Sequence, residues 1–227
     1  MIQHTSKDFG VELRHLRERL VTMGRRAEEQ VVLALRAFNE RDDVAARAAI
    51  QGDELIDRDE SEIDELAFVM LATRQPVATD LRLITMSLKF VVDVERIADL
   101  ASGIAKRALE LNRLPRLDGD ADLTRLAALV LKNLRAVLDA FTQEDAEAAT
   151  AVIAADAEID RVNAGLFDVL LARVASEPET VTRVLPLTSV CRYLERIGDH
   201  VKNVAEEVVY MVRATDVRHR PLPSPRN

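Results

Sequence analysis

The sequence predicts an all-α protein built from two tandem copies of an antiparallel three-helix bundle, with six long helices. Three observations predict this fold. Gly and Pro number only 7 each among 227 residues, so long stretches contain no residue that breaks a helix. Apolar residues recur at three- and four-residue steps, which is the period of an amphipathic helix. The same order of helices and turns then occurs twice along the chain.

The first half of the chain, residues 1–113, is predicted to form the first bundle. A polar turn at 39–43 and a break at Pro76 separate its helices, because the residue before a proline avoids helical geometry. Asp43 is expected to cap the second helix with its carboxylate. The three predicted helices span about residues 9–38, 43–73 and 78–111.

A linker at 114–119, Leu-Pro-Arg-Leu-Asp-Gly, carries the clearest boundary signal in the chain. Residues 120–213 are predicted to form the second bundle, and the proline-containing residues 214–227 a flexible tail.

Three amphipathic helices joined by short turns pack antiparallel, since each must bury its apolar stripe against the other two. The predicted helices of this half span about 121–141, 146–175 and, after the Glu-Pro break at 177–178, the residues up to 213.

The two halves are internal repeats whose matching residues keep the same order. The constant offset is 103 in the first two helices and becomes 100 in the third, which places the length difference in the intervening loop. Chance agreement over so many positions is improbable, so we expect matching residues to lie at equivalent places on the two bundles. The matched acids are Asp42 and Asp145, Asp53 and Asp156, Asp57 and Asp160, Glu95 and Glu195, and Asp99 and Asp199.

The composition argues against several classes of protein. A net charge of −8 opposes a nucleic-acid partner, because contacts with phosphates need a surplus of Lys and Arg. The single cysteine, Cys191, cannot form an internal disulfide. No stretch approaches the ~20 apolar residues of a membrane span, and the N-terminus lacks the apolar core of a signal peptide. We therefore expect a cytoplasmic protein without direct membrane insertion.

Repeated pairs of acids, four residues apart, are the strongest signal for a functional site. This spacing places both carboxylates on one helix face, where like charges repel and a bound cation would convert the repulsion into coordination. Hard ions such as magnesium, manganese or iron suit oxygen ligands. The alternative is an ordinary charged surface, neutralised by neighbours such as Arg96 and Arg196. The paired acids are Asp53 with Asp57, Glu95 with Asp99, Asp156 with Asp160, and Glu195 with Asp199.

The motif Glu95-Arg-Ile-Ala-Asp99 and its fuller copy, which runs from Glu195 through Asp199 to Asn203, resemble the repeated motif of the PhoU family. The resemblance covers roughly residues 5–213 and implies two three-helix bundles that carry metal ions, often iron or zinc, on these motifs. It implies that Asn203, one turn beyond Asp199, extends the ligand set. The first copy departs from the pattern, because Gly103 stands at the matching position.

The resemblance also implies a function. PhoU-like proteins are expected to be homodimeric negative regulators of the phosphate-starvation response. They would act as adaptors between the ATPase subunit of the phosphate ABC transporter and a sensor histidine kinase. No catalytic residue is nominated, and the chain is not expected to be an enzyme. Two alternatives remain: a carboxylate-bridged metal enzyme, which would need inward-facing ligands on four helices of one bundle, and a helical scaffold without metal.

Overall fold

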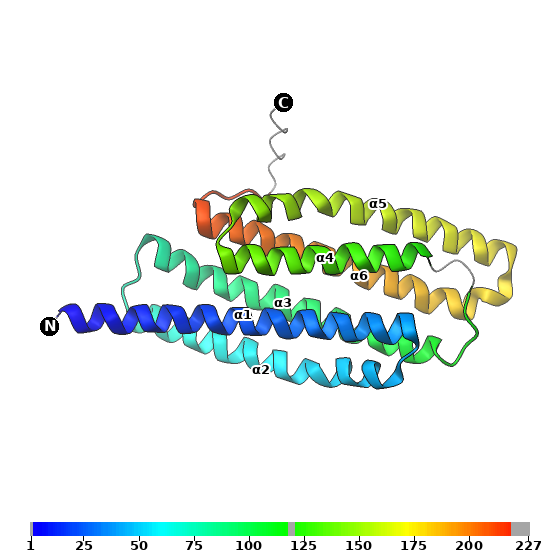
Figure 1. Ribbon diagram of the computed structural model, residues 1–227, viewed down its shortest axis with the longest axis horizontal. Helices are drawn as coiled ribbons and strands as arrows, with labels where there is room; N and C mark the ends of the chain where they lie inside the picture. The colour runs from blue at the N-terminus through cyan, green and yellow to red at the C-terminus, as the bar shows by residue number, and fades with distance from the viewer. Residues whose placement is uncertain (1, 118–120, 219–227) are drawn as a thin grey trace, which may run out of the picture.

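The computed structural model is an elongated bundle of six long α-helices that lie roughly along one axis (Figure 1). It describes residues 2–117 and 121–218. Residues 118–119 of the expected linker, residue 120 of the expected second bundle and residues 219–227 of the expected tail therefore lie outside the described ranges. Within these ranges there is no strand. The elements are α1 (Ile2–Glu40), α2 (Asp43–Thr73), α3 (Ala78–Leu111), α4 (Ala121–Gln143), α5 (Ala146–Ser176), a 3₁₀ turn (Pro178–Thr180) and α6 (Val181–Arg213).

The helices form two three-helix groups, which confirms the predicted all-α, two-repeat architecture. Helices α1, α2 and α3 pack on one another, as do α4, α5 and α6. The two groups meet through α3 against α6 and α1 against α4. Helices α2 and α5 contact only their own group and lie at opposite edges of the molecule (Figure 1). Each acid-bearing pair, α2 with α3 and α5 with α6, therefore includes an outermost helix.

Helices α1 and α4 run antiparallel where the two groups meet. Arg17, in the first half of α1, pairs with Glu144, just beyond the end of α4. Further along α1, Glu28 accepts a hydrogen bond of 2.6 Å from the Nε of Arg135, which lies earlier in α4. A close approach accompanies this contact, because a Cβ at Gly24 would lie 2.6 Å from Leu138 Cδ2.

Helices α3 and α6 also run antiparallel across the seam between the groups. Asn203 Nδ2 donates to Asp93 Oδ1 at 3.0 Å. The matching contact joins Gly103 to Tyr193. Gly103 occupies the position that matches Asn203, and Tyr193 the position that matches Asp93. Equivalent helices thus contact the opposite half in equivalent ways, and the two halves are related by an approximate twofold axis.

The turn between the first two helices of each half has the same backbone structure twice. Arg41 and Glu144 both adopt left-handed φ angles, of 59° and 54°, directly before a capping aspartate. Asp42 and Asp145 each accept hydrogen bonds of 2.9 and 3.0 Å from the N–H groups two and three residues later. The expectation that Asp43 caps α2 was wrong by one residue, since Asp43 already lies in the first turn.

The apolar faces of both groups merge into one continuous core. Phe90 of α3 and Phe141 of α4 lie with their ring centroids 4.9 Å apart, which joins the first half directly to the second. Both rings are fully buried. Cys191 is buried in the same core, and burial raises the pKa of its thiol to about 12. It therefore acts as a small apolar side chain.

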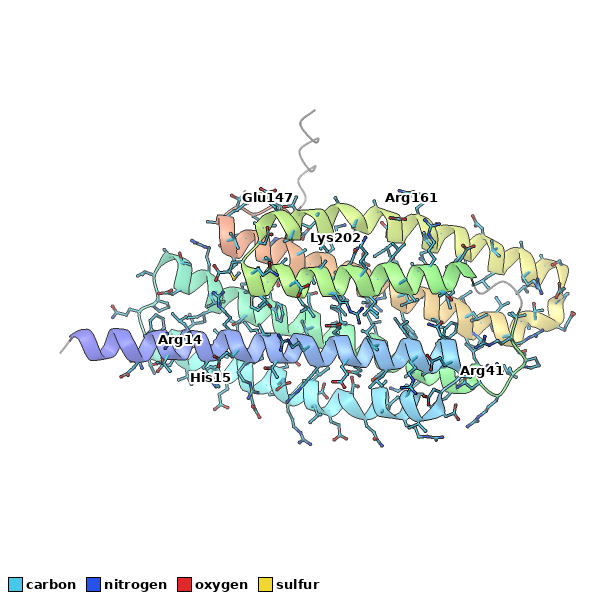
Figure 2. All side chains as sticks on the ribbon, in the orientation of Figure 1. Arg14, His15, Arg41, Glu147, Arg161 and Lys202 are labelled. Carbon is cyan, nitrogen blue, oxygen red and sulfur yellow. The ribbon has the colours of Figure 1, made fainter. Side chains whose placement is uncertain are left out.

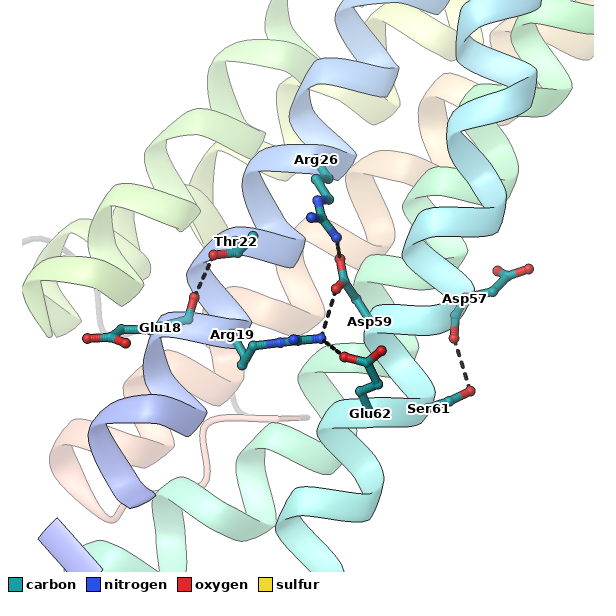
Figure 3. A network of polar contacts seen from close by, with 8 residues as sticks. All are labelled: Glu18, Arg19, Thr22, Arg26, Asp57, Asp59, Ser61 and Glu62. Carbon is teal, nitrogen blue, oxygen red and sulfur yellow. Dashed lines mark hydrogen bonds and ion pairs between the residues drawn. The ribbon is translucent and has the colours of Figure 1, made fainter. Parts of the chain in front are cut away.

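An ion-pair network centred on the buried Asp59 ties α1 to α2 in the first half (Figure 3). Asp59, 4% exposed, accepts a 3.1 Å hydrogen bond from Arg19 and pairs with Arg26. Arg19 also pairs with Glu62 on the rim. The second half has Val162 at the position that matches Asp59. This network therefore distinguishes the two repeats.

Over the described parts of the chain, no helix combines the length and apolar character required to cross a bilayer.

Candidate functional site

The predicted acids of the first half lie along the α2–α3 face. Glu95 is the most affected of them, because burial, followed by repulsion from Asp99, raises its pKa to about 7. Asp57 also repels it from α2. The pKa of Asp57 is itself raised by burial, Asp53 and Asp99. Asp57 points away from the ion-pair network that joins α2 to α1 (Figure 3). The antiparallel register therefore brings the acids of both helices to one face.

Two further acids on α2, Glu60 and Asp64, belong to this surface and were missed from the sequence. Burial and repulsion from Asp64 and Asp57 raise the pKa of Glu60. Burial raises the pKa of Asp64, whose Oδ1 is buried with no hydrogen-bond partner among the described residues. Their spacing in the sequence could have identified them. Steps of four, three and four residues lead from Asp53 through Asp57 and Glu60 to Asp64, which keeps all four acids on one helix face.

A buried glutamine of α1 holds Asp53 by a hydrogen bond. Gln30, 3% exposed, donates through Nε2 to Asp53 Oδ1 at 3.2 Å and to Ser102 Oγ at 2.9 Å. The same Nε2 lies 3.3 Å from the carbonyl oxygen of Ala98 on α3. One side chain of α1 thus contacts both acid-bearing helices and helps to set their register.

The second half brings its four predicted acids together on the α5–α6 face. Burial and the neighbouring Asp156 and Asp160 raise the pKa of Asp199. Burial, Asp199 and Asp160 raise the pKa of Glu195. Asp156 is 4% exposed and accepts a 2.8 Å hydrogen bond from Lys202 Nζ (Lys202 is labelled in Figure 2). A lysine of α6 thus provides an internal cation at the buried edge of this cluster.

Asn203 does not join these acids in the structure. Its amide donates to Asp93 of α3, which also lies 2.7 Å from His200 Nδ1. The reason is geometric, because a four-residue step along a helix overshoots a full turn by roughly 40°. Two such steps from Glu195 carry Asn203 away from α5 and toward α3. In the first half Gly103 stands at this place and leaves little room for a side chain, since a Cβ there would lie 3.0 Å from Tyr193 Cε2.

Arginine pairing also contributes at the first cluster. Arg96 Nε lies 3.4 Å from Glu95 Oε2, and Arg96 NH1 lies 3.2 Å from Asp99 Oδ2. Arg96 is 55% exposed, so solvent screens these pairs. Among the residues that the structure describes, no three His, Cys, Asp or Glu side chains are arranged to hold a metal ion. Both clusters therefore present repelling carboxylates of which only some are neutralised by neighbouring cations.

Comparison with known proteins also identifies two repeats in the chain. A family model described as the PhoU domain matches the chain twice, over residues 20–108 and 123–208. The chain belongs to the PhoU family. Each matched segment includes one acidic cluster, so the two PhoU domains coincide with the two copies of the candidate site.

Relatives in the PhoU family match almost the whole chain. A homologue of the phosphate-specific transport system accessory protein PhoU from Pseudomonas aeruginosa is 39% identical over 96% of this chain and 91% of its own length. The Pseudomonas putida homologue is 40% identical over 98% of this chain and 87% of its own. The Escherichia coli K12 protein PhoU is 33% identical over 96% and 90%, respectively.

Solved PhoU structures have the same fold. The crystal structure of PhoU from Pseudomonas aeruginosa aligns with a TM-score of 0.88 at 38% identity, covering 91% of this chain and all of that one. The regulatory protein PhoU of the phosphate transport system from Streptococcus pneumoniae aligns with a TM-score of 0.85 at 26% identity, covering 92% and 99%. The duplicated PhoU architecture therefore extends through the six helices of this chain.

Proposed function

We propose that this chain is a cytoplasmic accessory regulator of a phosphate-specific transport system that holds down the phosphate-starvation response when phosphate is plentiful. It would act as an adaptor, with contacts to the ATPase subunit of the phosphate ABC transporter and to a sensor histidine kinase. The observation that carries the proposal is similarity along nearly the full chain to proteins named as accessory proteins of that system. Those relatives are named for an accessory role and not for a reaction.

The shape of the molecule supports work by surface contact. The outermost helices α2 and α5 contact only their own groups and lie at opposite edges. Each carries an exposed phenylalanine, Phe68 at 60% and Phe167 at 54% exposure. Partner helices of a kinase or transporter subunit would bury these rings and gain hydrophobic free energy. Two separate faces would let one molecule contact two partners, and a homodimer would double that number.

The acidic clusters offer the oxygen donors that a metal ion needs, although in the structure no three of the described side chains converge on one ion position. Carboxylates whose pKa values are raised by burial and mutual repulsion gain when a cation replaces their protons. We propose that Asp57, Glu95 and Asp99 hold a divalent or trivalent ion in the first half, with Asp53 nearby. In the second half Asp156, Asp160, Glu195 and Asp199 would do so. Oxygen donors favour magnesium, manganese or iron, while zinc is also bound by carboxylates.

Deletion of the gene tests the regulatory role. Transcription from phosphate-starvation promoters is expected to rise in phosphate-rich medium, and the intact gene supplied on a plasmid should reverse the rise. A deletion strain whose transcription stays at the wild-type level would remove the basis for a negative regulator.

Affinity capture from phosphate-replete cells tests the adaptor role. The transporter ATPase subunit and a sensor kinase are expected to copurify with the tagged chain. Phe68→Ser and Phe167→Ser variants separate the two outer faces, with Val44→Ser, at an exposed position in the first turn of α2, as the matched surface control. If neither partner copurifies with the wild-type chain, the adaptor proposal is lost.

Elemental analysis tests the metal assignment. The Glu195→Ala/Asp199→Ala variant is expected to retain less metal than the wild-type protein when both are purified in parallel. A Glu54→Ala/Arg58→Ala variant, at exposed positions of α2, serves as control. Equal metal content in wild type and in the Glu195→Ala/Asp199→Ala variant would exclude these ligands.

A further inference from the structure

A cavity of about 380 Å³ lies where the two halves meet, away from both acidic clusters. Its walls come from α1, the beginning of α3, the residue after α4 and the last turn of α6. Pockets of 300–1,000 Å³ are typical of small-molecule sites in proteins. The cavity therefore has the size and the location of a binding site between repeats.

Three arginines, Arg14, Arg17 and Arg82, line this cavity in a chain whose net charge is −8. Two carboxylates, Asp80 and Glu144, also line it. Glu144 pairs with Arg17, so this arginine is already neutralised. The cavity is thus locally cationic on an acidic molecule, which favours an anionic ligand.

The other two arginines have no carboxylate partner among the residues that the structure describes. Arg82 is held in place by neutral acceptors, since its Nε donates to the carbonyl oxygen of Met211 at 3.3 Å and its NH2 group to Thr79 Oγ1 at 3.1 Å. These bonds orient the guanidinium without cancelling its charge. Arg14 is exposed at the rim on α1 (labelled in Figure 2). Guanidinium groups bind phosphate oxygens through paired, charge-assisted hydrogen bonds.

We propose that this cavity binds a small phosphate-bearing ligand, with the phosphate held between Arg14 and Arg82. The inference is carried by the cavity and its arginines, and it does not depend on the proposed adaptor role. The ligand would contact α1 and α3 of the first half together with the last turn of α6. Its binding would therefore stabilise the seam between the halves. Asp80 opposes the phosphate charge and limits the affinity.

Isothermal titration calorimetry on the full chain tests the proposal with three probes: inorganic phosphate, pyrophosphate and ATP. At least one of them is expected to bind with one site per chain and to raise the melting temperature. The Arg14→Gln and Arg82→Gln variants should each bind it about tenfold more weakly, the loss expected for one charge-assisted contact. Asp80→Asn should bind it severalfold more tightly.

Arg47→Gln is the matched control, since Arg47 is exposed on α2 and pairs only weakly with Asp43 at 3.6 Å. Arg14 forms no hydrogen bond or ion pair with the residues that the structure describes, so Arg14→Gln keeps the test valid even if Arg82→Gln is destabilised. The comparison among probes shows whether a free phosphate or a larger phosphorylated molecule is the ligand. The proposal is overturned if none of the probes binds at millimolar concentration, or if Arg47→Gln weakens binding as much as Arg14→Gln does.

Discussion

Lys202 Nζ lies 2.8 Å from Asp156 Oδ2, so the second acidic cluster contains a cation supplied by its own helix pair. Asp156 is 4% exposed, whereas the lysine side chain is 39% exposed. The matching position in the first half is Ser102, which is buried and uncharged. The two clusters therefore differ in the way their buried aspartate is balanced, and this difference can be measured.

Lys202→Gln should lower the free energy of unfolding by about 1–2 kcal/mol, because the buried Asp156 loses a charged hydrogen bond. Added magnesium or manganese should then raise the melting temperature of the variant more than that of the wild-type protein, since a metal ion can replace the missing charge. Thermal unfolding with and without metal measures both effects. Lys106→Gln, at an exposed position of α3, is the control. A variant that responds to metal no more than the wild type would contradict the idea of lysine as an internal cation.

Asp59→Ala should destabilise the protein by about 1–3 kcal/mol, because it removes the buried acceptor for both Arg19 and Arg26 (Figure 3). Glu62→Ala removes only a pair on the rim, where the carboxylate is 61% exposed, and should cost less than about 1 kcal/mol. Urea denaturation of both variants measures the difference. Equal losses would show that burial of Asp59 adds nothing to the network.

Gly103→Ala should lower the free energy of unfolding by about 1 kcal/mol or more. The new methyl group would lie 3.0 Å from the Tyr193 ring, and the resulting overpacking outweighs the gain in helix propensity. Gly165→Ala is the matched comparison, since no atom lies within 4 Å of the place that its new methyl group would take on α5. That variant should be more stable by roughly 0.5–1 kcal/mol. Chemical denaturation distinguishes the two signs, and stabilisation by both substitutions would contradict the packing of Tyr193 on Gly103.

Glu207 should make stability depend on pH in a defined window. Burial, followed by repulsion from Asp93, raises its pKa to about 9 from the ordinary value of 4.5. The folded state therefore holds an extra proton between these values, and the free energy of unfolding falls as the pH rises through them. Glu207→Gln should flatten this fall and be more stable than wild type at pH 9, by at least about 1 kcal/mol. Urea titrations from pH 5.5 to 9 test this, with Glu54→Gln as the exposed control. An unchanged pH slope in Glu207→Gln would show that another group is responsible.

The six helices could be predicted because their ends depend on local chemistry. Pro76 and Pro178 mark the breaks before α3 and α6, and polar turns end α1 and α4. The capping residue was misplaced because two adjacent aspartates, Asp42 and Asp43, are equally good caps by type. Only the left-handed backbone at Arg41 decides between them, and that conformation depends on how the turn packs.

The acidic clusters were predictable in part. Helix periodicity correctly paired Glu195 with Asp199, and the repeat located their mates. Asn203, the expected third ligand of this set, does not join them. It lies two turns beyond Glu195, so its side chain faces α3, where it donates to Asp93. The stripe that continues to Asp64 was overlooked, although its spacing was available. The arginine-lined cavity was out of reach, since its walls come from segments up to about 200 residues apart.

The approximate twofold relation between the halves has a consequence for specificity. In a symmetric dimer of identical units, every substitution at the seam appears twice, and both copies of a contact must change together. Here one copy of the α3–α6 contact joins Asp93 to Asn203, and the other stacks Tyr193 on Gly103. Because both units belong to one chain, a polar and an aromatic version of the same helix contact occur in one molecule. The two halves of one chain can therefore diverge residue by residue, so their surfaces need not be identical.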